Sequence, residues 1–122
     1  MKVLLSIKPE FAEKIFNGTK KYEFRKCIFK KKDIDKVVVY VSSPVQRVVG
    51  EFDIETILND DVDSIWNQTK KASGITEDFY RLYFAHRETA YAIKIGHVSR
   101  YQQSKKLSDF NIGFAPQSFV YL

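Results

Sequence analysis

Residues 18–25, which read GTKKYEFR, combine the side chains that a site for a nucleobase or a phosphate group needs. Arg25 carries a planar guanidinium that suits a phosphate or a base edge, and Lys20 or Lys21 adds a point charge. Glu23 is an acceptor for an exocyclic amine, and the two aromatic residues of the stretch offer ring faces for a base. The spacing therefore indicates a candidate ligand site.

The same residues also fit a purely structural interpretation. In a regular strand Glu23 pairs with Arg25 or Lys21 along one exposed face, and such an ion pair stabilises a protein by no more than about 1 kcal/mol. Lys20 and Glu23 are three residues apart, so they point to opposite faces of a regular strand. They share a site only if Lys20 belongs to the turn at Gly18 or a bulge intervenes. The spacing alone leaves both interpretations open.

If the site performs chemistry, Lys20 and Glu23 are its candidate catalytic residues. A lysine that acts as a general base needs a pKa lowered from about 10.4 to roughly 7 to 8, and the negative charge of Glu23 would raise that pKa instead. The pair therefore favours Glu23 as the base and Lys20 as an electrostatic stabiliser. Two classes of function remain: a binding module for RNA or a nucleotide, and a small hydrolase or nuclease.

Basic residues are concentrated next to this stretch. The net charge of the chain is +5, and residues 20–36 contain eight lysines or arginines against three acidic residues, an excess of five. Residues 51–63 contain six acidic residues and no basic one. Such a dipolar surface steers anionic partners to one side, although a lysine-rich loop can also serve only to keep a protein soluble. The lysines that we expect to contact phosphates are Lys26, Lys30, Lys31 and Lys32.

Five further residues are weaker candidates for ligand contact. Ser6 and Lys8 lie on the face of a predicted first strand that could border the site. Ser42 and Ser43 follow a later strand, at an end where loops gather. Gln117 could supply an amide that reads a base edge, although a turn after the preceding proline explains it nearly as well.

The composition narrows the class of protein. A chain of 122 residues with 44% hydrophobic residues fits one compact domain, residues 1–122. No apolar run reaches the roughly 18 to 20 residues of a membrane span, and the start is interrupted too soon for a signal peptide, so we expect a cytoplasmic protein. Cys27 is the only cysteine, and His86 and His97 are far apart, so the sequence predicts no disulfide, metal site or cofactor.

The first part of the chain alternates between strand and helix patterns. Residues 3–8 alternate as a strand, and Pro9 then begins a short helix that Gly18 closes. Residues 21–25 predict a second strand, with its aromatic side chains buried and its charges displayed. Residues 37–41, VVVYV, are apolar on both faces, which predicts a central, well-covered strand.

A longer strand is predicted over residues 46–58. Val48, Phe52 and Ile54 face inward in this pattern, and Gly50 marks a bulge or a barrel corner.

The rest of the chain predicts two helices followed by two strands. The helices cover residues 60–74 and 75–86, and the strands cover residues 90–98 and 118–122. Phe79, Leu82 and Tyr83 of the second helix are expected in the core, as is Trp66 of the first. The sequence therefore predicts an α+β fold on a small, partly closed β-barrel of about five or six strands, with helices inserted after the first and fourth strands.

The chain resembles the ASCH domain family. The signature of that family, G-x-K-x-x-E-x-R, is met here by Gly18, Lys20, Glu23 and Arg25. The segments VVVYVSSP, GEF, YAIKIG and APQSFVYL also resemble bacterial, archaeal and phage members, in the same order along the chain. The resemblance therefore covers essentially the whole sequence.

The resemblance implies a PUA-like β-barrel whose cleft lies between the first helix, the signature strand and neighbouring loops. Domains of this kind bind RNA or modified nucleobases, and ASCH relatives are linked to transcriptional coactivation, RNA binding or cleavage, and hydrolysis of an N4-acylated cytidine. The hydrolase branch has a threonine where Glu23 stands, and its catalytic glutamate aligns with Ser73, with Glu77 the nearest acid. We therefore expect the chain to bind RNA or a modified nucleotide in transcription or RNA-related regulation. The alternative is a small hydrolase that uses the same cleft, either a ribonuclease or an enzyme similar to the N4-acylcytidine amidohydrolases.

Overall fold

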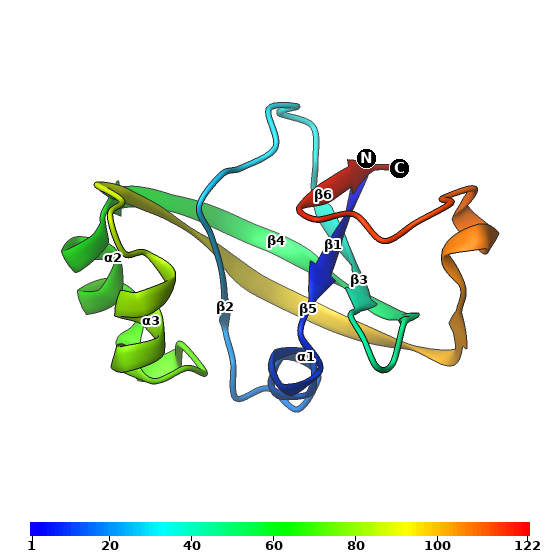
Figure 1. Cartoon of the computed structure of the whole chain (residues 1–122), viewed down its shortest axis with the longest axis horizontal. Coiled ribbons are helices and arrows are strands. Elements are labelled where there is room, and N and C mark those ends of the chain that lie inside the picture. The colour runs from blue at the N-terminus through cyan, green and yellow to red at the C-terminus, as the bar shows by residue number, and fades with distance from the viewer.

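The structure is a computed structural model that describes all 122 residues of the chain (Figure 1). In chain order, the elements are β1 (Lys2–Ile7), α1 (Pro9–Phe16), β2 (Tyr22–Arg25), β3 (Lys36–Val41), β4 (Arg47–Asp61), α2 (Val62–Thr69), the 3₁₀ turn η1 (Lys70–Ala72), α3 (Glu77–Tyr83), β5 (Thr89–Lys105), the 3₁₀ turn η2 (Leu107–Phe110) and β6 (Phe119–Tyr121). No helix is long and apolar enough to cross a membrane.

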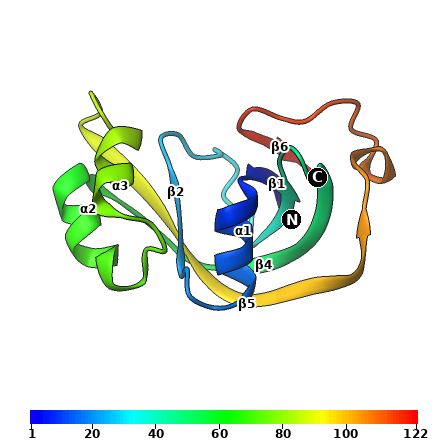
Figure 2. The same ribbon diagram turned by 60° about the horizontal axis from the view of Figure 1, so that its bottom comes forward.

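The six strands form one sheet in the order β2-β5-β4-β3-β1-β6. β1 pairs in parallel with β3 and antiparallel with β6, and the other pairs are antiparallel. The long β4 and β5 bend around α1 and β1, so the sheet curls into a half-barrel (Figure 2). This confirms the predicted α+β fold on a partly closed barrel, with α1 after the first strand and α2 and α3 after the fourth.

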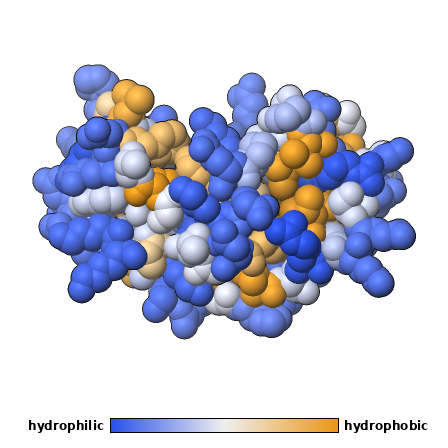
Figure 3. All heavy atoms as spheres, turned by 90° about the horizontal axis from the view of Figure 1, so that it is seen from below, coloured by the Kyte–Doolittle hydropathy of each residue, from blue (hydrophilic) through white to orange (hydrophobic).

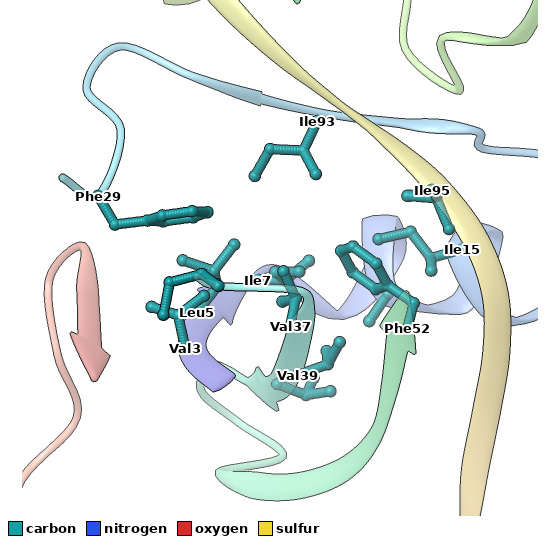
Figure 4. Packing of buried hydrophobic residues seen from close by; sticks show 13 residues of the cluster. Val3, Leu5, Ile7, Ile15, Phe29, Val37, Val39, Phe52, Ile93 and Ile95 are labelled. Carbon is teal, nitrogen blue, oxygen red and sulfur yellow. The ribbon is translucent and has the colours of Figure 1, made fainter. Parts of the chain in front are cut away.

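The main core fills the concave side of the sheet (Figure 4). Its side chains come from β1, α1, β3, β4, β5 and the loop between β2 and β3, and α1 contributes Ala12 and Ile15. β3 is buried on both faces, because Val37 and Val39 belong to this core while Val38 packs on the opposite face. β3 is therefore the central strand that its uninterrupted apolar sequence predicts.

A bulge in β4 overturns one part of the predicted pattern. Val48 and Phe52 were expected on the same face, but Val48 packs on the convex side and Phe52 lies in the concave core. The register with β5 shifts between Val48 and Gly50, which reverses the alternation. A Cβ at Gly50 would lie 2.5 Å from the carbonyl oxygen of Ser99 on β5, so the close approach of β4 to β5 at this position requires glycine.

A second core cluster joins α2 and α3 to β2 and β5. Trp66 is buried there, as predicted. The predicted core face of α3 is wrong, because Leu82 is 76% exposed while Tyr80 and Phe84 are buried. Five of the six residues from Phe79 to Phe84 are apolar, so the sequence pattern does not distinguish the two faces.

Candidate functional site

An open pocket lies between the end of β1, the start of α1, β2 and α3. Its volume is about 170 Å³. The residues that line it are Ser6, Ile7, Lys8, Phe11, Glu23, Phe24, Arg25, Ile75, Phe79 and Tyr83. Four of the predicted ligand-binding residues therefore lie on one wall or rim, facing aromatic side chains of α1 and α3: Ser6, Lys8, Glu23 and Arg25.

Glu23 is inside the pocket wall and not on an exposed strand face. Its residue surface is only 7% exposed, and its Oε2 lies 3.5 Å from Nε of Arg25. The expectation that β2 displays its charges is therefore wrong for Glu23. The ion pair of the structural interpretation exists, but it lies in the pocket, where both charges are shielded from water.

Arg25 bridges the open side of the half-barrel. Its Nη2 donates to the carbonyl oxygen of Ser6 at 3.2 Å and to that of Ser118 at 3.4 Å. The Nε atom is buried and has no hydrogen-bond partner. Because Nη2 already bonds to the backbone, the guanidinium is less available to a phosphate than its type alone indicated.

Lys20 lies behind the aromatic wall of the pocket and does not line it. The residue is 2% exposed, and its Nζ donates to the carbonyl oxygen of Ser73 at 2.7 Å. Nζ also lies 5.3 Å from the ring centroid of Phe11 and 4.9 Å from that of Phe24, and both rings line the pocket. Lys20 precedes β2 in the turn after Gly18, which resolves the spacing problem of a regular strand.

Burial controls the charge of Lys20. Removal from water lowers the pKa of this lysine from 10.5 to about 8, although the negative charge of Glu23 acts in the opposite direction. Glu23 therefore acts on the pKa of Lys20 in the predicted direction, but desolvation outweighs this attraction, and the net shift is downward. Near pH 8, a substantial fraction of Lys20 is a neutral amine.

The turn before α3 is held by lysines. The carbonyl groups of residues 72–74 accept, in order, from the backbone N of Lys21 at 2.8 Å, Nζ of Lys20 at 2.7 Å and Nζ of Lys14 at 3.0 Å. Ile75, which follows this turn, lines the pocket. The signature lysine therefore positions the chain that leads into α3.

Phe79 and Tyr83 are the pocket residues that the sequence interpretation assigned to the core. Their rings stack with centroids 6.4 Å apart, and the ring of Phe11 lies edge-on to Phe79 at 5.2 Å. Burial raises the pKa of Tyr83, so its hydroxyl stays neutral. One signal in the sequence could have identified them as pocket residues. Phe79 and Tyr83 form one aromatic pair at helical spacing, Tyr80 and Phe84 form a second, and only one of the two pairs can face the core.

The carboxylate that the hydrolase branch places near α3 is absent from the pocket. Ser73, at the aligned position, is buried, and its hydroxyl donates to the carbonyl oxygen of Ile75 at 3.0 Å. Glu77 is exposed and pairs with Arg81. Glu23 is the one carboxylate that lines the pocket.

The remaining candidates lie around the pocket or away from it. Ser42 and Ser43 follow β3 and do not line the pocket. Gln117 is exposed on a segment that borders it, because the carbonyl oxygen of Pro116 accepts a hydrogen bond of 2.8 Å from the Ser6 hydroxyl. Lys21 is exposed beside the turn. The side chains of Lys26, Lys30, Lys31 and Lys32 are exposed on the loop that follows β2.

A second hollow lies on the other side of α1 and is lined mainly by apolar residues, with Glu13 and Arg100 at its edge. It contains none of the signature residues. The face seen from below is largely hydrophilic, with separate apolar patches (Figure 3). No group of three or more histidine, cysteine or acidic residues is arranged to hold a metal ion.

Comparison with known proteins gives relatives over nearly the whole chain. Residues 1–114 match the family model described as "Domain of unknown function (DUF365)". The chain is 30% identical over 122 residues to an ASCH domain-containing ribonuclease of Zymomonas mobilis, covering 98% of this chain and 82% of that protein. The crystal structure of ASCH from Zymomonas mobilis has a TM-score of 0.90 at 28% identity, covering 99% of this chain and 87% of that one.

Two proteins of Ureaplasma parvum also contain a similar segment. The chain is 37% identical over 121 residues to ATP synthase subunit alpha and 32% identical over 123 residues to large ribosomal subunit protein uL22. It spans only 15% and 39% of the lengths of these proteins. The N-terminal domain of McrB from Staphylothermus marinus, with a TM-score of 0.53 and 9% identity over 90% of this chain and 78% of that one, shares the fold alone.

Proposed function

Because the chain belongs to the ASCH domain family and to the DUF365 family, we propose that its pocket binds one nucleotide of an RNA. The observation that carries the proposal is the buried carboxylate of Glu23, 7% exposed, on the wall of a pocket whose other walls are aromatic. Isolating a carboxylate from water costs free energy unless partners compensate. A base that donates hydrogen bonds to Glu23 would supply such a partner beside Arg25.

The size and lining of the pocket support a single base. Its volume of about 170 Å³ is below the roughly 300–1,000 Å³ of sites for drug-sized ligands. Phe79 and Tyr83 offer faces on which a base can stack, an interaction worth about 1–3 kcal/mol per base. Glu23 accepts from an exocyclic amine or a ring N–H, and Lys8 at the rim is exposed for a phosphate.

RNA cleavage in the same pocket is the second candidate function. It is favoured by the ribonuclease among the relatives and by the position of Lys20, with its pKa of about 8, close to Glu23. In this proposal Glu23, the one carboxylate that lines the pocket, accepts a proton from the attacking hydroxyl group. Lys20 is enclosed behind Phe11 and Phe24, so it acts only through the effect of its charge on Glu23.

Both candidates can be tested by measuring binding and product in parallel for four nucleoside monophosphates and a short single-stranded RNA. We expect Phe79→Ala to weaken binding by about 5- to 150-fold, the equivalent of about 1–3 kcal/mol. Leu82→Ala, on the same helix but 76% exposed and outside the pocket, is the matched control and should bind as wild type.

The same assay separates a binding module from a nuclease. Glu23→Gln should weaken binding if the carboxylate only accepts hydrogen bonds, and should stop product formation while sparing binding if it is the base. Glu77→Gln is the control, because Glu77 is an exposed carboxylate outside the pocket. Equal behaviour of wild type, Phe79→Ala and Glu23→Gln with every ligand would rule out a nucleotide site in this pocket.

A further inference from the structure

Three lysines each place their ammonium group over an aromatic ring along one side of the molecule. Nζ of Lys8 lies 5.5 Å from the ring centroid of Phe79, Nζ of Lys26 lies 4.8 Å from that of Tyr83, and Nζ of Lys31 lies 4.6 Å from that of Tyr121. These six residues are called the lysine–aromatic track. In each pair an exposed lysine places its ammonium group over the aromatic ring.

The loop after β2 connects the pairs at the pocket to the pair on β6. Phe79 and Tyr83 line the pocket, and the chain from Lys26 to Lys31 then leads to the third pair. The hydroxyl of Tyr121 accepts from the backbone N of Lys30 at 2.8 Å and from that of Lys31 at 3.2 Å. Figure 1 shows the loop after β2 rising to the top of the view, turning there and descending past β6 into β3.

We propose that the lysine–aromatic track binds the single-stranded continuation of the RNA whose nucleotide occupies the pocket. This inference rests on the proposed function and extends it to the path of the strand. A groove that combines cationic side chains with aromatic faces is the arrangement that binds single strands without a fixed sequence. The stretch from residue 20 to residue 36, with its excess of five positive charges, surrounds this path.

Each pair offers a cation and a ring face: the pairs at Phe79 and Tyr83 offer them to the nucleotide in the pocket, and the pair at Tyr121 offers them to the continuation of the strand. An ammonium over a half-buried ring is held more weakly than a base that stacks on the same ring. A base can therefore replace the lysine on the ring, and the four-carbon stem lets the displaced ammonium reach a neighbouring phosphate. An acidic protein segment would satisfy the lysines but would leave the three ring faces of Phe79, Tyr83 and Tyr121 unused.

The length of the track sets the length of RNA that it can bind. Lys31 is five positions after Lys26, so the loop spans at most about 17 Å between them. Stacked nucleotides rise by about 3.4 Å along a strand, so this part of the track holds no more than about five nucleotides. Affinity should therefore increase with RNA length and level off near five or six nucleotides, counting the nucleotide in the pocket.

The test measures fluorescence anisotropy of labelled oligouridylates and oligoadenylates of one to ten nucleotides, with wild type, Lys31→Ala and Lys71→Ala. Lys71 is exposed on η1, outside the track, and provides the control. Loss of one phosphate contact lowers affinity about fourfold at 0.15 M salt and reduces the slope of log affinity against log salt by about 0.7. We expect this loss for Lys31→Ala with the hexanucleotide, no loss with the mononucleotide, and no loss for Lys71→Ala.

The possible failures are distinguishable. If mononucleotides bind but affinity does not grow with length, or if Lys31→Ala equals Lys71→Ala, the track is wrong while the pocket proposal stands. If wild type binds neither mononucleotide nor oligonucleotide, the proposed function fails and the track fails with it. If decaglutamate, run as a competitor, binds more tightly than the oligonucleotides and depends equally on Lys31, the surface is a protein-docking surface and the RNA path is wrong.

Discussion

The buried signature lysine makes a quantitative prediction about stability and pH. Lys20 is 2% exposed, and burial lowers its pKa from 10.5 to about 8 in the folded protein. The folded protein therefore binds this proton more weakly than the unfolded chain does. The resulting penalty is fully present below pH 8 and disappears as the pH rises through 10.5, so the free energy of unfolding should increase with pH in this window.

The magnitude follows from the difference between the two pKa values. A pKa of about 8 against 10.5 corresponds to a penalty of about 3 kcal/mol, at about 1.4 kcal/mol per pKa unit. About 2 kcal/mol of this penalty should be lost between pH 7 and about pH 9.5. Lys20→Met removes the titration while keeping an unbranched side chain that can fill the space between Phe11 and Phe24.

The assay is urea denaturation of wild type and Lys20→Met at neutral pH and near pH 9.5. The absolute difference at one pH is not diagnostic, because the variant also leaves the carbonyl group of Ser73 without its donor. The change of that difference with pH is diagnostic. Burial raises the pKa of Tyr80 to about 12, which destabilises both proteins at high pH and cancels in the comparison.

Parallel pH profiles for the two proteins would refute this interpretation of Lys20. A direct titration of the lysine side chain by NMR gives an independent check. A midpoint near 10.5 would show that the ammonium group is solvated in the folded protein. A midpoint near 8 together with parallel stability profiles would place the same low pKa in the unfolded chain, which is also contrary to the prediction.

Two further predictions concern stability. Phe24→Ala should lower the free energy of unfolding by about 3–5 kcal/mol, because the Phe24 side chain of β2 is buried against α2 and α3. Tyr22 is only half-buried, so Tyr22→Ala should lower the free energy of unfolding clearly less; equal losses in urea denaturation would contradict this order. Gly50→Ala should destabilise the protein by about 1–3 kcal/mol, because the new Cβ would lie 2.5 Å from the carbonyl oxygen of Ser99. Gly113→Ala is the control, since a Cβ at Gly113 meets nothing within 4 Å. Comparable melting temperatures for the two variants would count against the close approach at Gly50.

The architecture could be predicted from the sequence because the patterns for the central elements are unambiguous. An uninterrupted apolar run identified the covered strand β3, and Pro9 and Gly18 marked the two ends of α1. The alternation in β4 was less informative. Gly50 indicated a bulge, but the residue at which the two faces exchange depends on pairing with β5, which the pattern of one strand does not contain.

The site was harder to predict because its key residues are defined by burial. Nothing in the spacing of Lys20 and Glu23 indicated that both would be enclosed, and the sign of the pKa shift at Lys20 depends on that enclosure. Phe79 and Tyr83 were assigned to the core because a hydrophobic pattern does not distinguish a core face from a pocket face. The GTKKYEFR motif located the pocket, and α3, distant in sequence, supplied its aromatic wall.

The pairing of β1 with both β3 and β6 has a consequence for folding kinetics. The contact between the Ser6 hydroxyl and Pro116 joins residues 110 positions apart, so the entropy of a long loop is lost before this contact forms. Chains dominated by such distant pairings reach the native state in milliseconds to seconds. The helices α2 and α3, close in sequence, can associate earlier. We therefore expect the pocket to bind a ligand only at the end of folding, after most of the helical circular-dichroism signal has returned.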